Sequence, residues 1–80
     1  MTTVEVLYFA SLRDAAGVER ESVQSGAADL AALYEELRRR HGFAFDASRL
    51  RVAVDGDFAR WSDAPRAGSE VVFIPPVSGG

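Results

Sequence analysis

The chain has 80 residues and a net charge of −3, with 48% hydrophobic and 26% charged residues, which is an ordinary globular composition. A chain of this length forms one small domain with a single core, and it contains no apolar run of the roughly 18 to 20 residues that cross a membrane. The absence of cysteine excludes disulfides, cysteine-based zinc sites and a cysteine nucleophile, and the negative net charge argues against nucleic-acid binding.

The beginning of the chain, Met1–Glu5, has no basic stretch followed by an apolar one. We therefore expect no secretory signal and a cytoplasmic location. All nine basic residues are arginines, and lysine is absent. A chain without an ε-amine cannot form polymers through its own lysines, whatever chemistry takes place at its carboxyl end.

The first quarter of the chain predicts two strands joined by a short helix. Residues 4–9 alternate in polarity and predict a strand with one buried face. Residues 11–17 predict a helical turn with Ser11 as its N-cap and a glycine at its end. Residues 20–24 predict a second strand that is only weakly apolar, which is typical of a sheet edge.

The clearest helix begins after Asp29, a favourable N-cap residue. Its apolar side chains recur at positions i, i+3, i+4 and i+7 and form one stripe: Leu30, Leu33, Tyr34 and Leu37. The pairs Glu35/Arg39 and Glu36/Arg40 have the spacing and direction of helix-stabilising ion pairs. This amphipathic pattern predicts a helix that packs on a sheet.

The second half of the chain predicts three strands. After an irregular segment at 43–50, whose two phenylalanines are expected at the border of the core, residues 51–54 form a strand. Asp55-Gly56 predicts a type I′ turn into a returning strand at 58–61. Residues 71–74 predict the last strand, and this order of elements indicates a single α+β domain with one main helix across one mixed sheet.

A tail of six residues, 75–80, follows the domain at 1–74. It consists of Pro75, Pro76, Val77, Ser78, Gly79 and Gly80. The two prolines cannot donate to a ladder and favour polyproline II, so the tail reaches roughly 19 Å at about 3.1 Å per residue. Glycine has no Cβ and fits a narrow channel. Chain ends often consist of small residues that have no function, but a stiff spacer before terminal glycines predicts a tail that inserts into a partner.

Catalytic and metal-binding motifs are lacking. His41 is the only histidine and follows a run of arginines, so we expect a solvated residue at the helix end rather than a general base or metal ligand. Asp55-Gly56-Asp57 lacks the further oxygen ligands of a calcium loop, and no Walker loop is present. We expect no metal and no cofactor on this chain, and any chemistry at its carboxyl terminus.

The order of elements and the segment Phe73–Gly80 resemble the ubiquitin-like β-grasp sulfur carriers, and most closely the small subunits of molybdopterin synthase. The likeness spans the whole chain, and the opening segment 6–14 (VLYFASLRD) is also similar. Its most specific part is the run of apolar residues followed by Pro-Pro-Val-Ser-Gly-Gly at the end of the chain. Ile74 departs from the pattern, because an aromatic residue is expected there.

The resemblance implies that an E1-like adenylyltransferase uses ATP to adenylate the Gly80 carboxylate, and that sulfur then replaces the adenylate to give a thiocarboxylate. It further implies that the tail enters the large subunit of molybdopterin synthase. There it donates sulfur to cyclic pyranopterin monophosphate to build the molybdopterin dithiolene, and the large subunit supplies the lysine and acid–base groups.

The resemblance also implies a partner interface made of Phe9, Arg13, Phe58 and Ile74. Two alternatives remain for these residues, since Phe9 and Phe58 fit a core equally well and Arg13 fits an ordinary surface position. Two other functions remain as well. One is a sulfur carrier for thiamine, cysteine or thio-RNA synthesis, and the other is a ubiquitin-like binding module or protein modifier that carries no sulfur.

Overall fold

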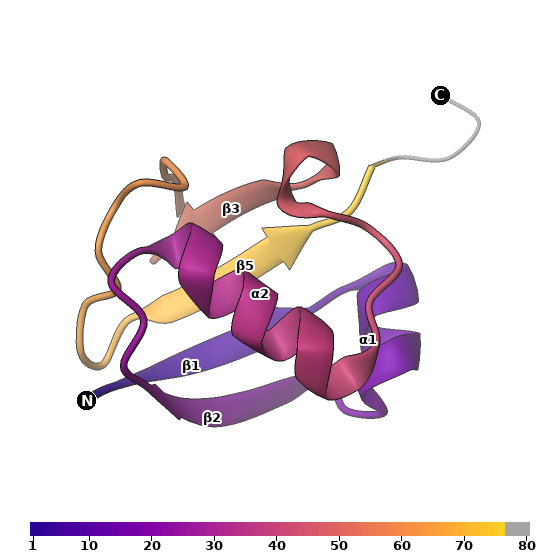
Figure 1. Ribbon diagram of the computed structural model, residues 1–80, viewed down its shortest axis with the longest axis horizontal. Helices are drawn as coiled ribbons and strands as arrows, with labels where there is room; N and C mark the ends of the chain where they lie inside the picture. Colours follow the sequence, from indigo (N-terminus) through magenta and orange to yellow (C-terminus); the bar gives the residue numbers. More distant parts are fainter. Residues whose placement is uncertain (77–80) are drawn as a thin grey trace.

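The computed structural model describes residues 1–76 (Figure 1). The elements in chain order are β1 (Thr2–Tyr8), α1 (Ala10–Ala16), β2 (Arg20–Ser25), α2 (Leu30–His41), the short 3₁₀ helix η1 (Ala47–Arg49), β3 (Arg51–Val54), β4 (Asp57–Phe58) and β5 (Glu70–Ile74). The strands form one mixed sheet in the order β2-β1-β5-β3-β4, in which β1 and β5 are parallel and the other neighbours are antiparallel. The predicted α+β fold with a β-grasp arrangement is confirmed.

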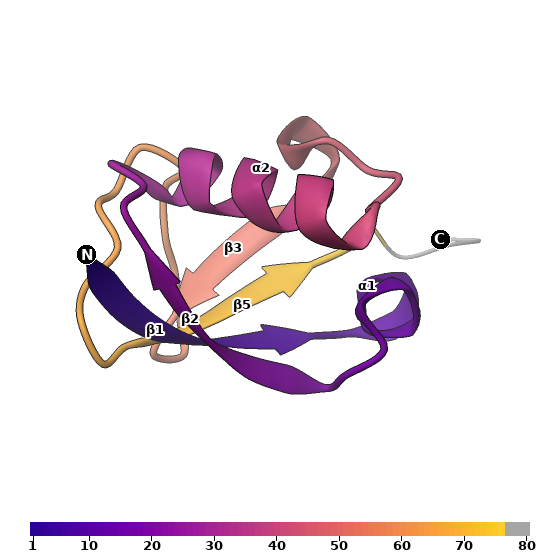
Figure 2. The same cartoon turned by 60° about the horizontal axis from the view of Figure 1, so that its bottom comes forward.

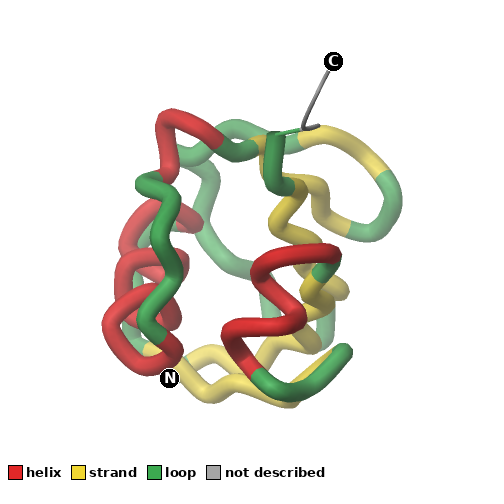
Figure 3. Tube along the Cα trace, turned by 90° about the vertical axis from the view of Figure 1, so that its right-hand side faces the viewer, coloured by secondary structure: helices red, strands yellow, loops and turns green. Residues whose placement is uncertain are grey.

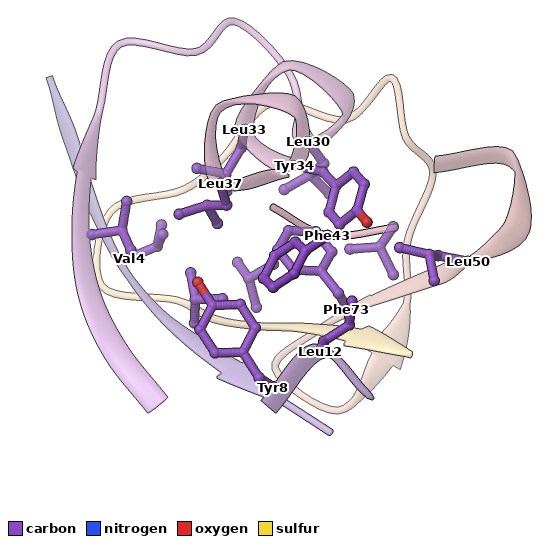
Figure 4. Packing of buried hydrophobic residues seen from close by; sticks show 14 residues of the cluster. Val4, Tyr8, Leu12, Leu30, Leu33, Tyr34, Leu37, Phe43, Leu50 and Phe73 are labelled. Carbon is purple, nitrogen blue, oxygen red and sulfur yellow. The ribbon is translucent and has the colours of Figure 1, made fainter. Parts of the chain in front are cut away.

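The core lies between the sheet and α2, which crosses one face of it (Figure 2). The stripe predicted for α2 is confirmed, since Leu30, Leu33, Tyr34 and Leu37 are all fully buried. The aromatic rings of Tyr34 and Phe73 meet edge to face with centroids 5.1 Å apart under the helix (Figure 4). Alternation along β1 and β5 supplies the opposite wall of the core, with Val4, Val6, Tyr8, Val71 and Phe73 pointing inward.

Both ends of α2 are capped, and the N-cap is the predicted Asp29. The Asp29 carboxylate accepts a hydrogen bond from the Ala32 N–H at 2.8 Å. Gly42 ends the helix with a φ of 75°, and its N–H donates to the Arg38 carbonyl at 2.8 Å. A left-handed φ of this kind suits glycine, because a Cβ at that position is strained.

The predicted return strand at 58–61 is wrong, because β4 stops at Phe58. The chain then leaves the sheet and covers the N-terminus of α2. The carbonyls of Trp61 and Asp63 accept hydrogen bonds from the N–H groups of Ala31 and Leu30, at 3.0 and 2.9 Å. These backbone groups satisfy helix donors that have no partner within the helix, which a strand could not do.

Two predictions about local helix chemistry are also wrong. Ser11 is not an N-cap, since α1 begins one residue earlier at Ala10 and its cap residue makes no side-chain hydrogen bond. The expected pairs Glu35/Arg39 and Glu36/Arg40 are not among the ion pairs of residues 1–76. Tertiary partners compete with the spacing along the helix: Glu36 accepts a hydrogen bond from Ser25 on β2 at 2.9 Å, and Arg40 lies 3.9 Å from Glu21.

His41 is not the solvated residue that its neighbours in sequence suggested. Its side chain is only 15% exposed, and its Nε2 lies 2.7 Å from Oε2 of Glu21 on β2. The same carboxylate accepts a hydrogen bond from the buried Tyr8 hydroxyl at 2.5 Å. The cluster of Tyr8, Glu21, Arg40 and His41 therefore joins β1, β2 and α2, and no pattern along the chain reveals that β2 brings an acid to this place.

Two pKa shifts follow from this cluster. Burial and the hydrogen bond to Glu21 raise the pKa of the Tyr8 hydroxyl well above its usual value. Burial acts to raise the pKa of Glu21, but the hydrogen bonds from Tyr8 and His41, together with the charges of His41 and Arg40, outweigh it and lower the pKa. A lowered folded-state pKa contributes stability above the unfolded pKa, and this contribution is lost as pH falls through the folded value.

Candidate functional site: the outer face of the sheet and the end of β5

The face of the sheet opposite α2, called the outer face below, has no helix on it in the part of the chain that the structure describes (Figure 2). Residues paired in a ladder point to the same side of the sheet. The register pairs Leu7 with Val72, Val72 with Ala53 and Ala53 with Phe58. Because their neighbours Val6 and Val71 point into the core, these four residues form one apolar row across β1, β5, β3 and β4.

The hairpin turn places Phe58 on this row. Asp55 and Gly56 both have positive φ values, 51° and 90°, as the predicted type I′ turn requires. The two-residue turn fixes the register, so Phe58 stands opposite Ala53 and remains 70% exposed. Phe58 is therefore no core residue, and that alternative is wrong.

Phe9 also lies at the surface, where it is 49% exposed. Its backbone is extended, with φ −124° and ψ 153°, and so continues the alternation of β1. Its side chain consequently leaves on the side opposite the buried Tyr8. The structure excludes the core alternative for Phe9 as well, and it puts this ring at the end of β1 where α1 begins.

Ile74 is the last residue of β5 and is partly buried. It pairs with Arg51 of β3, and the ladder ends before Pro75, as predicted from the two prolines. Figures 1 and 3 show that the end of β5 and α1 lie at the same end of the molecule. The predicted tail residues Val77, Ser78, Gly79 and Gly80 lie outside the described residues.

Arg13 lies on α1 at this end, and its side chain is exposed. Within residues 1–76 it makes no ion pair or side-chain hydrogen bond. Its role at an interface stays a prediction. The sheet register and the position of α1 thus leave the side chains of all four predicted interface residues at least partly exposed. The tail continues directly from one of them, Ile74.

Two charged features of the outer face were missed by sequence reasoning. Arg20 lies 3.2 Å from Glu5 and 3.6 Å from Glu70, so three strands contribute to one exposed ion-pair network. The guanidinium carbon of Arg51 lies 5.6 Å from the centroid of the Phe58 ring. The signal that could have found the second contact is the Asp55-Gly56 turn, because its register places residues 51 and 58 on the same face.

The described residues form neither a candidate metal site nor a membrane-spanning helix. Among residues 1–76 there is no group of three or more histidine, cysteine, aspartate or glutamate side chains placed to hold a metal ion. None of the helices in this part of the chain has the length and apolar character needed to cross a membrane.

A family model described as the ThiS family matches residues 6–80, which include both the outer face and the tail. The chain belongs to the ThiS family. It is 36% identical over 84 residues to the molybdopterin synthase sulfur carrier subunit of Mycobacterium tuberculosis, and the match covers 100% of both chains. This ThiS-family chain is thus similar over its full length to a sulfur carrier.

Two solved structures place the ThiS-family fold among known proteins. Small archaeal modifier protein 1 of Haloferax volcanii matches with a TM-score of 0.77 and 26% identity, covering 96% of this chain and 100% of that one. A chain in the complex of subunits 1 and 2 of the molybdopterin-converting factor from Helicobacter pylori matches with a TM-score of 0.67 and 22% identity, covering 99% and 100%. The second likeness shows the fold alone.

Proposed function

We propose that this chain is the sulfur carrier and small subunit of a molybdopterin synthase, acting in the cytoplasm. The observation that carries the proposal is the junction at Ile74: the ladder ends, two prolines follow, and an apolar outer face begins beside the departing chain. A full-length match to a molybdopterin synthase sulfur carrier subunit supports it. The carrier part is the tail, Pro75 to Gly80, and the docking part is the outer face with Phe9, Arg13, Phe58 and Ile74.

The chemistry takes place at the Gly80 carboxylate. A carboxylate is a poor electrophile because its charge is delocalised over two oxygens. An E1-like adenylyltransferase transfers AMP from ATP to this group and releases pyrophosphate, and sulfide-level sulfur from a donor then attacks the carbonyl and displaces AMP to leave a thiocarboxylate. The chain has no cysteine on which sulfur could be carried instead. ATP is bound by the activating partner, so this chain needs no cofactor of its own.

The second half of the reaction takes place in the large subunit. The tail enters its active site, where the thiocarboxylate gives its sulfur to cyclic pyranopterin monophosphate and Gly80 returns to a carboxylate. This chain lacks lysine, and its one histidine is held by Glu21 in the cluster on the α2 side of the sheet. The large subunit therefore supplies the lysine and the acid–base groups, and this chain supplies the sulfur and the docking surface.

Docking has to offset the ordering of the tail. Fixing six backbone residues costs about 6–12 kcal/mol, with the prolines lowering the cost and the glycines raising it. Phe58 and Phe9 are 70% and 49% exposed, so each contributes roughly 1–2 kcal/mol when a partner covers it. Burial of the two aromatic side chains alone does not offset the cost of ordering the tail. Contacts along the apolar row and by the tail itself must contribute the remaining binding free energy.

Mass spectrometry of the intact chain tests the carrier function. The chain is incubated with the E1-like enzyme, ATP and a sulfur donor, and we expect one oxygen to be replaced by one sulfur at Gly80. A variant that lacks Gly80 is the matched control and should stay unmodified. An unmodified wild-type chain contradicts the proposal. If the thiocarboxylate forms but the large subunit and cyclic pyranopterin monophosphate yield no dithiolene product, the chain is a carrier for another pathway.

A second candidate function is protein modification, which the likeness to small archaeal modifier protein 1 favours. In this function the activated Gly80 carbonyl is attacked by a lysine of another protein, and the carbonyl forms an isopeptide bond as the activating group leaves. The chain has no lysine, so it can be a donor in this reaction but no lysine acceptor. Covalent adducts of the tagged chain that require Gly80 and survive denaturation and thiol reduction would favour modification over sulfur transfer.

A further inference from the structure

Two arginines lie on the outer face, and their surroundings differ. Arg20 pairs with Glu5 and Glu70, so its charge is neutralised within the chain. Arg51 is exposed and has no ion pair within residues 1–76, and its guanidinium stacks over Phe58 instead. The two residues have the same charge and share one face, but within residues 1–76 only Arg51 keeps its N–H donors open for an acceptor on another molecule.

The sheet register fixes where this open charge lies. Arg51 pairs with Ile74, the last residue of β5, so its Cα stands beside the point at which the tail begins. Its side chain reaches toward the neighbouring strand and covers Phe58. A partner that buries Phe58 and Ile74 therefore cannot avoid Arg51, which lies between them on the same face.

Burying a guanidinium without an acceptor is costly, and a carboxylate is the acceptor that matches its planar fork of donors. We propose that Arg51 binds a carboxylate of the partner subunit at the rim of the channel that receives the tail. The proposal rests on the proposed function, since the partner is the molybdopterin synthase large subunit. It adds a specificity residue that acts through position and charge on the partner and takes no part in the transfer of sulfur.

The contact of Arg51 with a carboxylate selects one orientation of the partner on the docking surface. Across the outer face, Glu5 and Glu70 share Arg20 and keep one net negative charge, the apolar row follows along β1 and β5, and Arg51 carries an open positive charge at the tail end. An apolar patch alone tolerates several orientations of a partner. A single charge that must meet a carboxylate selects the one in which the tail faces its channel.

The first test measures binding of the large subunit from the same organism by titration calorimetry. We expect Arg51→Gln to weaken binding about 30-fold or more, as for other buried charge pairs at interfaces, and Arg51→Glu to weaken it further by repulsion. Arg39→Glu is the matched control, because Arg39 is an exposed arginine of α2 on the other side of the sheet. It makes the same change in net charge and should alter the dissociation constant less than about threefold.

The results distinguish a failure of the Arg51 proposal from a failure of the proposed function. If wild type binds and Arg51→Glu weakens binding no more than Arg39→Glu does, the Arg51 proposal is overturned while the proposed function stands. If the wild-type chain itself does not bind the large subunit, the proposed function fails and the Arg51 contact fails with it. Unfolding midpoints of all variants should stay close to that of wild type, with at most a small decrease for the Arg51 variants because they lose the stack on Phe58. A loss of folding would be visible in these curves.

The second test identifies the carboxylate. Because the chain has no lysine, Arg51→Lys introduces its only ε-amine, and a carbodiimide joins that amine directly to a carboxylate in contact with it. Peptide mapping should find residue 51 linked to an aspartate or glutamate of the large subunit, and Arg39→Lys should give no such link. A complex that forms but yields no link at residue 51 would overturn the proposal. Exchanging the linked acid for arginine should restore binding to Arg51→Glu.

Discussion

Truncation of Phe58 separates binding from folding in this protein. Phe58 is 70% exposed on the outer face, while Phe73 is fully buried on the opposite side of the same sheet. We expect Phe58→Ala to weaken binding of the large subunit and leave the fold intact. Phe73→Ala is the matched control, with the same change in side chain, and should mainly destabilise the domain.

The magnitudes follow from the two environments. Phe58→Ala removes the stack with Arg51, which at an exposed site contributes about 0.5–1 kcal/mol. In the complex it forfeits roughly 1–2 kcal/mol of apolar burial, which is about 5- to 30-fold in the dissociation constant. Phe73→Ala costs about 3–5 kcal/mol of the roughly 4–12 kcal/mol expected for a domain of this size.

The assay is urea unfolding of each variant, followed by calorimetric titration with the large subunit. We expect Phe58→Ala to unfold within about 1 kcal/mol of wild type and to bind about 5- to 30-fold more weakly. If Phe58→Ala binds like wild type, the outer face is not the docking surface. If Phe58→Ala destabilises the fold as much as Phe73→Ala does, Phe58 is a structural residue and not a docking residue.

Three further predictions concern other parts of the chain. Glu21→Gln should lower stability at pH 7 and reduce the loss of stability on acidification, because the stability from the lowered pKa of Glu21 is fully present above the unfolded pKa of about 4.3 and is lost as pH falls through the folded pKa; urea midpoints at pH 7 and pH 3 measure both effects. Tyr34→Phe removes the hydrogen bond from the hydroxyl to the Phe45 carbonyl (2.6 Å) and should cost about 1–3 kcal/mol in urea unfolding. Deleting Gly80 should abolish thiocarboxylate formation in intact-mass spectra while leaving the unfolding midpoint unchanged.

Patterns along the chain were sufficient for most features that depend on near neighbours, and the N-cap of α1 is an exception. The stripe of Leu30, Leu33, Tyr34 and Leu37 predicted the face of α2 that is buried, and Asp29 predicted its beginning. The Asp55-Gly56 turn predicted the hairpin. These features are local because helix periodicity, caps and two-residue turns involve residues only a few positions apart.

Most of the features that sequence reasoning missed involve distant residues. His41 is held by Glu21 from β2, and Glu36 by Ser25, so the spacing within α2 did not decide their partners. The residues expected to continue β4 instead supply carbonyls to the N-terminus of α2. In each case a partner from another element competes with the local partner. The free energy of the contact with the distant partner depends on tertiary packing, which cannot be inferred from spacing along the sequence.

The sequence alone determined that this is a small α+β domain with an apolar strand, a proline spacer and a terminal pair of glycines, because these are properties of consecutive residues. Only the tertiary structure decided that Phe9 and Phe58 are exposed and that Arg51 stacks on Phe58 beside Ile74. The physical reason is that alternation assigns a strand residue to one of two faces. Which face is covered depends on where α2 packs, and which residues meet across strands depends on the register of the sheet.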